Sequence, residues 1–465
     1  MRQHFARLVL CVCVLTTGAT GMAAELSNHE ALARDIFREL IEINTTDSVG
    51  DNTAAAVAMA ARLRDAGFLD SDIHLLAPAA RKGNLVFRLR SPAPTKRPIL
   101  LLAHLDVVEA EPEDWSIPPF EFLERDGYYY GRGTTDDKAM CAIWMANLIR
   151  MKQQGYVSNR DIIVALTADE EGGPNNGVQF LLAEHFELVD AAIVLNEGGS
   201  GAMQDGKRLA NSVQAAEKVF QSYELEVTNP GGHSSLPRSD NAIYQLIEGL
   251  TRISKYQFPI ELNEVTRAWV RQGFSALPAR QTEIALGILE TPPTAASVSF
   301  FERVPAYNAR VRTTCIATQL RAGHAENALP QRATATVNCR ILPGVPPNQV
   351  LETLKSLVDD PQITFTLMNE PTPSPPSPLT EEVMAPIQEI TEAMWPGVAV
   401  IPTMSTGATD GLYFRLAGIP VYGVSGIFGD MNDIRAHGRD ERILIESFLD
   451  GLEFLDRLVR AYTSE

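Results

Sequence analysis

Between residues 98 and 197, four short apolar runs each end in acidic or histidine side chains. The polar segments that follow these runs are His104-Leu-Asp106, Gly131 to Asp137, Asp169-Glu170-Glu171 and Glu197. Short apolar runs bounded by turn residues are typical of buried strands. In open α/β sheets, ligands gather beyond the carboxyl ends of the strands. We therefore expect these polar side chains to converge at one edge of a sheet.

The residue types in this cluster are those of a metal centre. One imidazole, His104, converges with several carboxylates, and a second candidate imidazole, His437, stands downstream of the apolar run Ile419 to Val424. This mixture suits borderline divalent ions, Zn²⁺ above all, with Co²⁺ or Mn²⁺ as alternatives. Two such ions need a carboxylate that can bridge them. The sequence thus predicts a hydrolase with two divalent metal ions.

His104 and Asp106 are two residues apart, so an extended backbone points both side chains to the same side. Asp106 is then placed to accept a hydrogen bond from the ring nitrogen of His104 that binds no metal, which fixes the tautomer and the ring orientation. We expect His104 to be a ligand and Asp106 to orient it. The alternative for this tripeptide, a His and an Asp satisfied in a loop, is disfavoured by the neighbouring motifs.

Five blocks of the sequence resemble the signature blocks of the M20 metallopeptidases. That family includes glutamate carboxypeptidases, aminoacylases, dipeptidases and succinyl-diaminopimelate desuccinylases. The blocks are His104-Leu-Asp106-Val-Val108, Gly131-Arg-Gly-Thr-Thr-Asp136-Asp137-Lys138, Asp169-Glu170-Glu171-Gly172, Asn196-Glu197-Gly198 and Ala436-His437-Gly438. They follow the family's order and span almost the whole chain. Each block alone is a weak signal, but five in order are specific.

The resemblance implies a role for each residue of the metal centre. Asp136 would bridge the two ions, and the Asp136–Asp137 peptide bond would be cis; two acids favoured by a helix N-terminus are compatible with that role. Glu170 would be the general base that moves a proton from the attacking water to the leaving nitrogen. Two solvated acids at a strand end are the alternative for Glu170 and its neighbour. The implied ligands are His104, Asp136 and Glu197 for one ion, and Asp136, Glu171 and His437 for the other.

Further residues are assigned to the substrate by the same resemblance. The implied anchors are Asn327, Arg340 and Gly407, and an arginine fork suits a free carboxylate. A surface strand residue is the alternative for Arg340. His233, in Gly231-Gly-His-Ser-Ser235, would donate to the developing oxyanion in the active site of the partner subunit of a homodimer. The alternative is a histidine that orders its own glycine-rich turn.

Strands alternate with helices over residues 25–214, which predicts an α/β domain with a mixed, mostly parallel sheet sandwiched by helices. Near residue 215 the pattern changes to strictly alternating strands. Residues 215–340 are therefore expected to form an inserted α+β unit, which by the resemblance is a lid and dimerisation domain. Residues 341–465 are expected to return to the first domain. The stretch 256–304 is longer than a plain lid needs, and its use has no assignment.

Residues 1–24 have the layout of a secretory signal peptide. Arg2 and Arg7 precede the apolar run Leu8 to Leu15, and small residues follow. The run is too short for a stable membrane span. We expect cleavage near Ala23 or Ala24 and a periplasmic or secreted protein that is not held at a membrane. An uncleaved membrane anchor is the alternative.

Net charge and cysteine usage limit the partners. The chain contains 40 basic and 58 acidic residues; without the two arginines of residues 1–24, 38 basic residues remain and the formal net charge is −20. Such a surface disfavours nucleic acid and anionic membranes. Outside that segment lie Cys141, Cys315 and Cys339. Cys315 and Cys339 either pair in an oxidising compartment or remain reduced.

Together these features predict an exported dinuclear-metal amidohydrolase that cleaves an amide bond next to a free α-carboxylate. Carboxypeptidase or dipeptidase activity on small peptides is the leading expectation, and hydrolysis of N-acyl amino acids is the second. Two alternatives belong to other classes. A catalytically inactive binding protein of the same fold is disfavoured by the intact Glu170, and a dinuclear phosphoesterase is disfavoured by a lid with carboxylate anchors.

Overall fold

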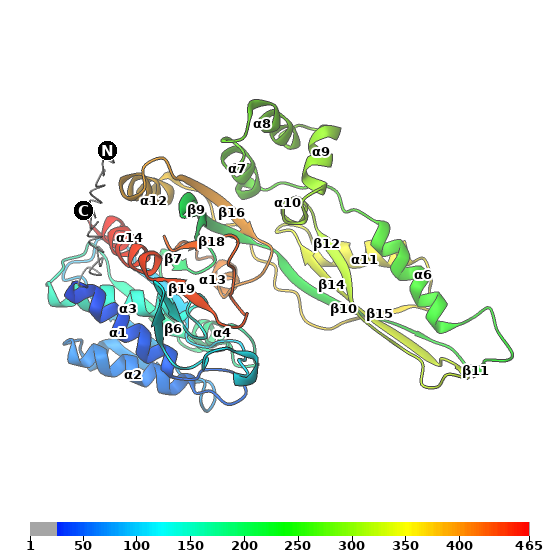
Figure 1. Ribbon diagram of the computed structural model, residues 1–465, viewed down its shortest axis with the longest axis horizontal. Coiled ribbons are helices and arrows are strands. Elements are labelled where there is room, and N and C mark those ends of the chain that lie inside the picture. The colour runs from blue at the N-terminus through cyan, green and yellow to red at the C-terminus, as the bar shows by residue number, and fades with distance from the viewer. Residues whose placement is uncertain (1–25, 465) are drawn as a thin grey trace, which may run out of the picture.

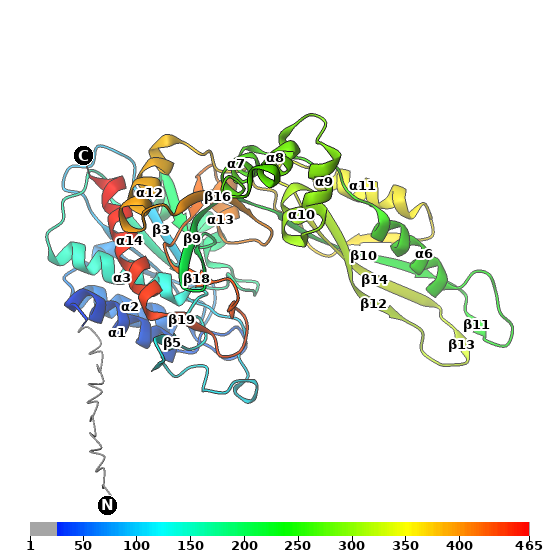
Figure 2. The same cartoon turned by 45° about the horizontal axis from the view of Figure 1, so that its top comes forward.

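The computed structural model describes residues 26–464, and the predicted signal peptide, residues 1–24, lies outside them. The chain forms a first domain around a large sheet and an elongated second domain that projects from it (Figure 1). The view in Figure 2 shows the same two parts, with a group of short helices close to the junction. Among the described residues, no helix is both long and apolar enough to cross a membrane.

The first domain contains a mixed sheet of ten strands with a parallel centre. Nine strands follow the order β1-β2-β6-β3-β7-β17-β9-β8-β18, and β16 pairs with β9. The centre, from β6 through β3 and β7 to β17, is parallel, so these strands all end at one edge. The predicted fold class is confirmed. The strands are β1 (Ile73–Leu76), β2 (Asn84–Leu89), β3 (Ile99–His104), β6 (Ile162–Thr167), β7 (Ile193–Asn196), β8 (Gly201–Gln204), β9 (Lys207–Glu217), β16 (Ala399–Ser405), β17 (Val421–Gly423) and β18 (Phe428–Asp430).

Helices cover both faces of this sheet. Along β3, Ile99 and Leu101 pack into one core, whereas Leu100 and Leu102 pack into the other, because successive side chains of a strand point to opposite faces. This is why the apolar run is continuous rather than alternating. The helices on the first core are α1 (Asn28–Glu42), α2 (Asn52–Asp65), α3 (Lys138–Gln153), α12 (Glu381–Met394) and α14 (Ile445–Thr463). Those on the second core are α4 (Gly177–Glu184), α5 (Phe186–Val189) and α13 (Gly411–Leu416).

A separate three-stranded sheet holds the aromatic run Tyr128–Tyr130. The sequence predicts this run as a strand of the large sheet, and that placement is wrong. The run forms β5 (Tyr128–Tyr130), which pairs antiparallel with β4 (Leu123–Arg125) and β19 (Arg442–Leu444). The buried ring of Tyr129 packs edge-on against Phe37 and Phe448. The run therefore packs against helices α1 and α14 rather than within the large sheet.

The second domain is a four-stranded antiparallel sheet with two helices packed on it. Its strand order is β12-β14-β10-β15. A two-stranded ribbon of β11 and β13 forms its far tip (Figure 1). The elements are β10 (Val219–Thr228), β11 (Gly232–His233), α6 (Ala242–Lys255), β12 (Thr314–Ala322), β13 (Ala328–Leu329), β14 (Arg332–Ile341), α11 (Pro347–Val358) and β15 (Thr364–Leu367).

The predicted return to the first domain at residue 341 is wrong. Helix α11 packs against α6, and β15 pairs with β10, so both belong to the second domain. The chain rejoins the first domain within the proline-rich segment 370–379, where Ser377 exchanges hydrogen bonds with the backbone of Val421 in β17, and α12 follows. Apolar periodicity identifies a helix but not the sheet that it covers, and so the boundary was placed too early.

The unassigned stretch 256–304 is mostly helical and extends to residue 311. Its side chains form a small core of their own, which includes Trp269, Phe274 and Phe301, and Ile401 of β16 packs against that core. Residues 256–311 therefore lie beside the large sheet, although in the sequence they stand between α6 and β12 of the second domain. Its helices are α7 (Glu264–Gly273), α8 (Ala279–Leu286), α9 (Ala295–Glu302) and α10 (Pro305–Val311).

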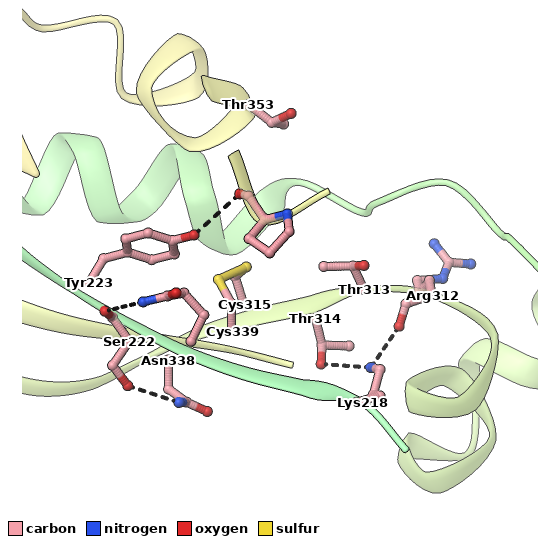
Figure 3. The surroundings of a disulfide bond; sticks show 12 residues. Lys218, Ser222, Tyr223, Arg312, Thr313, Thr314, Cys315, Asn338, Cys339 and Thr353 are labelled. Atoms are coloured by element: carbon pink, nitrogen blue, oxygen red, sulfur yellow. Dashed lines mark hydrogen bonds between the residues drawn. A yellow bond between two sulfur atoms is a disulfide. The ribbon is translucent and has the colours of Figure 1, made fainter. Parts of the chain in front are cut away.

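A disulfide joins Cys315 of β12 to Cys339 of β14 (Figure 3). The two residues are direct partners in the antiparallel register, so the bond crosses neighbouring strands. Cys141 is the remaining thiol of the described residues, and it is buried. Close to the disulfide, the ammonium group of Lys218 donates to the Arg312 carbonyl at 2.8 Å and to the Thr314 hydroxyl at 3.3 Å.

Candidate metal centre

The carboxyl ends of β3, β6 and β7 bring three of the predicted segments together. His104 is the last residue of β3, Asp169 to Glu171 follow β6, and Glu197 follows β7. Ligand atoms of His104, Glu170 and Glu197 lie within 4.8 Å of one another. The convergence predicted from the sequence is confirmed.

Asp136 lies between two groups of ligand atoms. Its Oδ1 is 3.0 Å from His104 Nε2, and its Oδ2 is 3.0 Å from His437 Nε2. Glu197 Oε2 is 3.9 Å from His104 Nε2, on the Oδ1 side. Glu171 Oε1 is 3.0 Å from His437 Nε2, on the Oδ2 side. Each oxygen of Asp136 thus faces one imidazole and one further carboxylate, as a bridging ligand requires. The Asp136–Asp137 peptide bond is cis, as the resemblance implied.

His437 reaches the centre from a loop between β18 and β19, not from the end of a strand of the large sheet. Its backbone adopts a left-handed conformation, with φ of 61°. Such a conformation is uncommon for a residue with a side chain and is found where the surrounding structure determines it. The position of this ligand therefore depends on loop geometry, which apolar periodicity does not reveal.

The donor set fits a pair of divalent ions. Glu171 Oε1 is buried and has no partner with hydrogen-bond geometry among residues 26–464, although it lies 3.0 Å from His437 Nε2. Two ligand atoms that approach without hydrogen-bond geometry are expected where both point to a common ion. Imidazole and carboxylate donors are those that Zn²⁺, Mn²⁺ and Co²⁺ accept. The centre offers one bridging carboxylate with an imidazole and a carboxylate on each side.

Electrostatics at the centre reflect many carboxylates in one buried place. Burial, together with the negative charge of Glu170, raises the pKa of Glu197 well above its usual range. Burial also raises the pKa of Glu171 to about 7. Burial opposes ionisation of Asp136 too, but its hydrogen bonds with His104 and His437 hold its pKa well below its usual range. A cation between these groups would offset their mutual repulsion.

Asp106 does not contact His104 in the predicted way. His104 Nδ1 lies 3.0 Å from the Asp106 backbone carbonyl, whereas the Asp106 carboxylate is 3.7 Å away, beyond hydrogen-bond distance. The carboxylate instead accepts a hydrogen bond from the backbone N–H of Glu171 at 2.9 Å. Asp106 therefore fixes the ring through its main chain and positions Glu171 through its side chain.

Glu170 lies beside the His104 and Glu197 ligand atoms and lines the adjoining cavity. Its neighbour Glu171 faces His437 instead, so the two glutamates point to different places, as the sequence predicts. Burial raises the pKa of Glu170 well above its usual range. Distance alone would also allow Glu170 to bind an ion, because its carboxylate oxygen lies within 4.8 Å of the ligand atoms of His104 and Glu197.

Glu441, which sequence reasoning missed, holds the loop that carries Asp136. Its fully buried carboxylate accepts from Arg132 Nη1 at 2.6 Å and from the Gly133 N–H at 3.1 Å. The other oxygen accepts from the backbone and the hydroxyl of Thr135, at 2.7 and 2.8 Å. The only available signal was an acid four residues after His437, in a segment that resembles the family loosely.

Two further buried acids support the centre without a sequence motif. Asp169 accepts from the ammonium group of Lys82 at 2.6 Å, which fixes the chain just before Glu170. Glu217, at the end of β9, accepts from the Thr409 N–H at 2.9 Å and pairs with Arg415. The contacts of Glu217 with Thr409 and Arg415 hold the loop that carries Gly407. Neither partner could be inferred from spacing, since each pair joins distant parts of the chain.

A cavity of about 560 Å³ opens beside the metal centre, between the two domains. Glu170, Glu171 and Gly407 line it from the first domain, and Arg340 lines it from β14 of the second. The guanidinium of Arg340 lies over the ring of Phe220, 4.7 Å from its centroid. Within residues 26–464 it forms no ion pair, so its hydrogen-bond donors are available to an anion. Two of the three predicted anchors therefore share one cavity with the centre.

Asn327 and His233 lie elsewhere in the chain. Both belong to the exposed ribbon at the tip of the second domain, where the Asn327 carbonyl accepts from the Ser234 N–H at 2.9 Å. His233 Nδ1 is 2.8 Å from the Ser235 hydroxyl. The tip is the part of the second domain farthest from the large sheet (Figure 1). Neither residue joins the metal centre of its own chain.

Comparisons with known proteins agree with this geometry. The sequence profile of the peptidase family M20/M25/M40 matches residues 100–461. Human N-fatty-acyl-amino acid synthase/hydrolase PM20D1 is 30% identical over 385 residues, which cover 81% of this chain and 76% of the human one. Probable carboxypeptidase S-like 2 of Dictyostelium discoideum is 29% identical, over 81% of this chain and 74% of that one. The structure of the M20 family metallo-carboxypeptidase Sso-CP2 from Sulfolobus solfataricus covers 92% of this chain and 99% of its own, with a TM-score of 0.68 at 18% identity, which shows a shared fold.

Proposed function

Since the chain belongs to the peptidase family M20/M25/M40, we propose that this hydrolase cleaves N-acyl amino acids at the amide bond next to the free α-carboxylate. The observation that carries the proposal is Arg340, which has no carboxylate partner in the described part of the chain and lies in the cavity that Glu170 and Glu171 also line. A guanidinium beside the catalytic carboxylates suits a substrate that ends in a carboxylate next to the scissile amide.

Carboxypeptidase or dipeptidase activity, the leading expectation from the sequence, would use the same centre and the same anchor. The two activities differ only in the group on the far side of the amide bond. Similarity to a human N-fatty-acyl-amino acid synthase/hydrolase supports an acyl group there. The apolar side chains of Phe220, Leu412 and Tyr413 in the cavity wall support it as well.

The proposed reaction needs few protein groups. Two divalent ions, Zn²⁺ before Co²⁺ or Mn²⁺, would supply Lewis-acid polarisation of the scissile carbonyl and a lowered pKa for the attacking water. Glu170 accepts the proton of that water and donates it to the leaving nitrogen as the C–N bond breaks. Arg340 binds the α-carboxylate and fixes the position of the amide. The partner's His233 donates to the carbonyl oxygen as it becomes negative. The residues that would hold the ions are His104, Asp136, Glu171, Glu197 and His437.

The homodimer is part of this proposal because the tip that carries His233 and Asn327 lies away from its own centre. A second copy could present the tip to the cavity. Export is proposed on residues 1–24 alone. N-terminal sequencing of protein recovered from the periplasm or the medium tests it, and a mature chain that retains Arg2 would contradict it.

A substrate panel tests the proposed activity. Metal-loaded protein is incubated with N-acyl amino acids of increasing chain length, with dipeptides of the same C-terminal residue, and with C-terminally amidated forms of each. We expect N-acyl amino acids to be cleaved fastest. The amides should react roughly 10–100-fold more slowly, because they lose a charge-assisted pair with Arg340.

Each outcome of the panel has a separate meaning. Equal rates for acids and amides contradict the carboxylate anchor. Faster cleavage of dipeptides than of N-acyl amino acids favours the dipeptidase alternative. No hydrolysis of any member, with both ions present by elemental analysis, favours a binding protein of the same fold.

A further inference from the structure

A second cavity, of about 270 Å³, lies at the opposite edge of the large sheet from the metal centre. Among the residues that line it are Arg160, two residues before β6, and Ala192 and Pro420, which directly precede β7 and β17. These strands belong to the parallel centre, so their beginnings lie at one edge and the metal ligands at the other. A six-residue strand spans about 20 Å, which separates the two sites.

Arg160 is the unusual residue of this cavity. Only 5% of its surface is exposed, yet among residues 26–464 no carboxylate pairs with it. In that part of the chain its one hydrogen bond runs from Nε to the Asn159 side chain, at 3.3 Å. An arginine is rarely buried without a partner, and a buried charge without one is costly. The terminal guanidinium nitrogens therefore have donors to offer at the cavity wall.

Most of the remaining lining residues have apolar side chains. Val383, Tyr422 and Tyr462 are almost completely buried and line the cavity. Both phenol hydroxyls already donate elsewhere: Tyr422 to the Pro378 carbonyl at 2.6 Å, and Tyr462 to the Val383 carbonyl at 2.7 Å. The tyrosines therefore contribute ring surface to a ligand rather than free hydroxyl groups.

The charges around the cavity leave one positive charge in excess. Lys96 and Arg160 are the cations of the lining, and Glu382 is its carboxylate. Glu382 is exposed, and its charge acts on Arg160 from beyond ion-pair distance. A ligand with a single negative charge would balance this arrangement, whereas a cation would meet both basic groups.

We propose that this cavity is a second ligand site, which binds a small monocarboxylate with an apolar tail. The carboxylate accepts two parallel hydrogen bonds from the Arg160 fork, and the tail lies against the rings of Tyr422 and Tyr462. The volume, below the range of about 300–1,000 Å³ for drug-sized ligands, restricts the tail to a short chain. The inference does not depend on the hydrolytic activity proposed above, since it concerns residues at the other edge of the sheet.

Calorimetric titration of the metal-loaded protein with hexanoate tests the site. Hexanol and acetate serve as controls that carry only the tail or only the carboxylate, and both should bind at least tenfold more weakly. Arg160→Met should weaken hexanoate binding at least tenfold. Ala461→Phe fills the mouth of the cavity from an exposed position on α14 and should have the same effect while Arg160 remains. Both variants should keep the hydrolytic activity of the wild type.

Arg340→Met separates the two sites, because it removes the carboxylate anchor beside the metal centre only. Hexanoate binding that persists in this variant and is lost in the other two supports the proposal. Absence of binding to the wild type at a hexanoate concentration of about 10 mM, roughly tenfold above a Kd of 1 mM, overturns the proposal. So does binding that Arg340→Met abolishes, or binding that Ala461→Phe leaves unchanged. If Arg160→Met does not fold, as circular dichroism would show, Ala461→Phe alone decides.

Discussion

Glu441 offers a direct test of whether the loop that carries Asp136 must be held from outside the metal centre. Replacing Glu441 by Gln keeps the size of the side chain but removes its charge. The carboxylate accepts four hydrogen bonds, two on each oxygen, from residues 132–135. An amide nitrogen cannot accept, so two of the four are lost. Arg132, which is 2% exposed, would then be a buried cation without its carboxylate.

The magnitude follows from these contacts. Hydrogen bonds to a charged group contribute about 1.5–3 kcal/mol each, and breaking a buried ion pair costs about 3–5 kcal/mol. The two figures describe overlapping contacts, so we expect Glu441→Gln to lower the free energy of unfolding by about 3–5 kcal/mol. The loop would also hold Asp136 less firmly, which should weaken metal binding roughly 10–100-fold, as loss of an outer partner of a ligand usually does.

Urea denaturation of metal-free protein measures the first effect, and titration with Zn²⁺ against a competing chelator measures the second. Glu453→Gln is the matched control, because Glu453 pairs with Arg457 at 2.7 Å on an exposed helix surface. That change should cost at most about 0.5 kcal/mol and leave metal affinity unaltered. A loss below about 1 kcal/mol in Glu441→Gln, with wild-type metal affinity, would refute the reasoning.

Three further predictions concern the catalytic residues and one buried lysine. Glu170→Gln should lower kcat by roughly 10²–10⁴ while elemental analysis finds the same metal content; loss of metal would instead exchange the roles assigned to Glu170 and Glu171. His233→Ala mixed with Glu170→Gln should recover about a quarter of wild-type activity after subunit exchange, because each mixed dimer has one intact site; no recovery, with exchange shown by native mass spectrometry, would confine His233 to its own chain. Burial lowers the pKa of Lys218 to about 7, so between its ordinary value near 10.4 and about 7 only the unfolded chain binds the proton, and wild-type stability falls as the pH decreases through that range. The stability of Lys218→Met relative to wild type, from urea denaturation, should therefore increase from pH 10 to pH 7 and level off below; parallel pH profiles would contradict the assignment.

The sequence could predict the part of the site whose residues directly follow strands of the large sheet. The continuous apolar runs before His104, Asp169 and Glu197 are those of strands buried on both faces, and each is followed by its polar residue without a gap. Such runs can occupy only the centre of a covered sheet, so the convergence of their ends follows from the topology. The resemblance supplied the bridging role of Asp136, and the structure places its two oxygens accordingly.

The contacts that sequence could not predict depend on loops and on pairs of distant residues. The alternation of an extended backbone predicts that His104 and Asp106 point to one side, but the Asp106 carboxylate accepts a hydrogen bond from the Glu171 N–H instead. Glu441 holds residues 132–135 across more than three hundred positions of sequence. The domain to which α11 belongs could not be predicted either, because its amphipathic pattern would allow it to pack on either domain.

The order of synthesis has a bearing on how this centre forms, because Asp136 joins groups from the two ends of the chain. His104 is made early, whereas His437 follows 333 positions later (437 minus 104), so at about 5–20 residues per second the centre stays incomplete for roughly 17–70 s. Strand β17, which pairs with β7, is also made late, and until then one edge of β7 is open to other chains. Nascent chains should therefore aggregate in a concentration-dependent way, and stable loading with both ions must wait until His437 has been made.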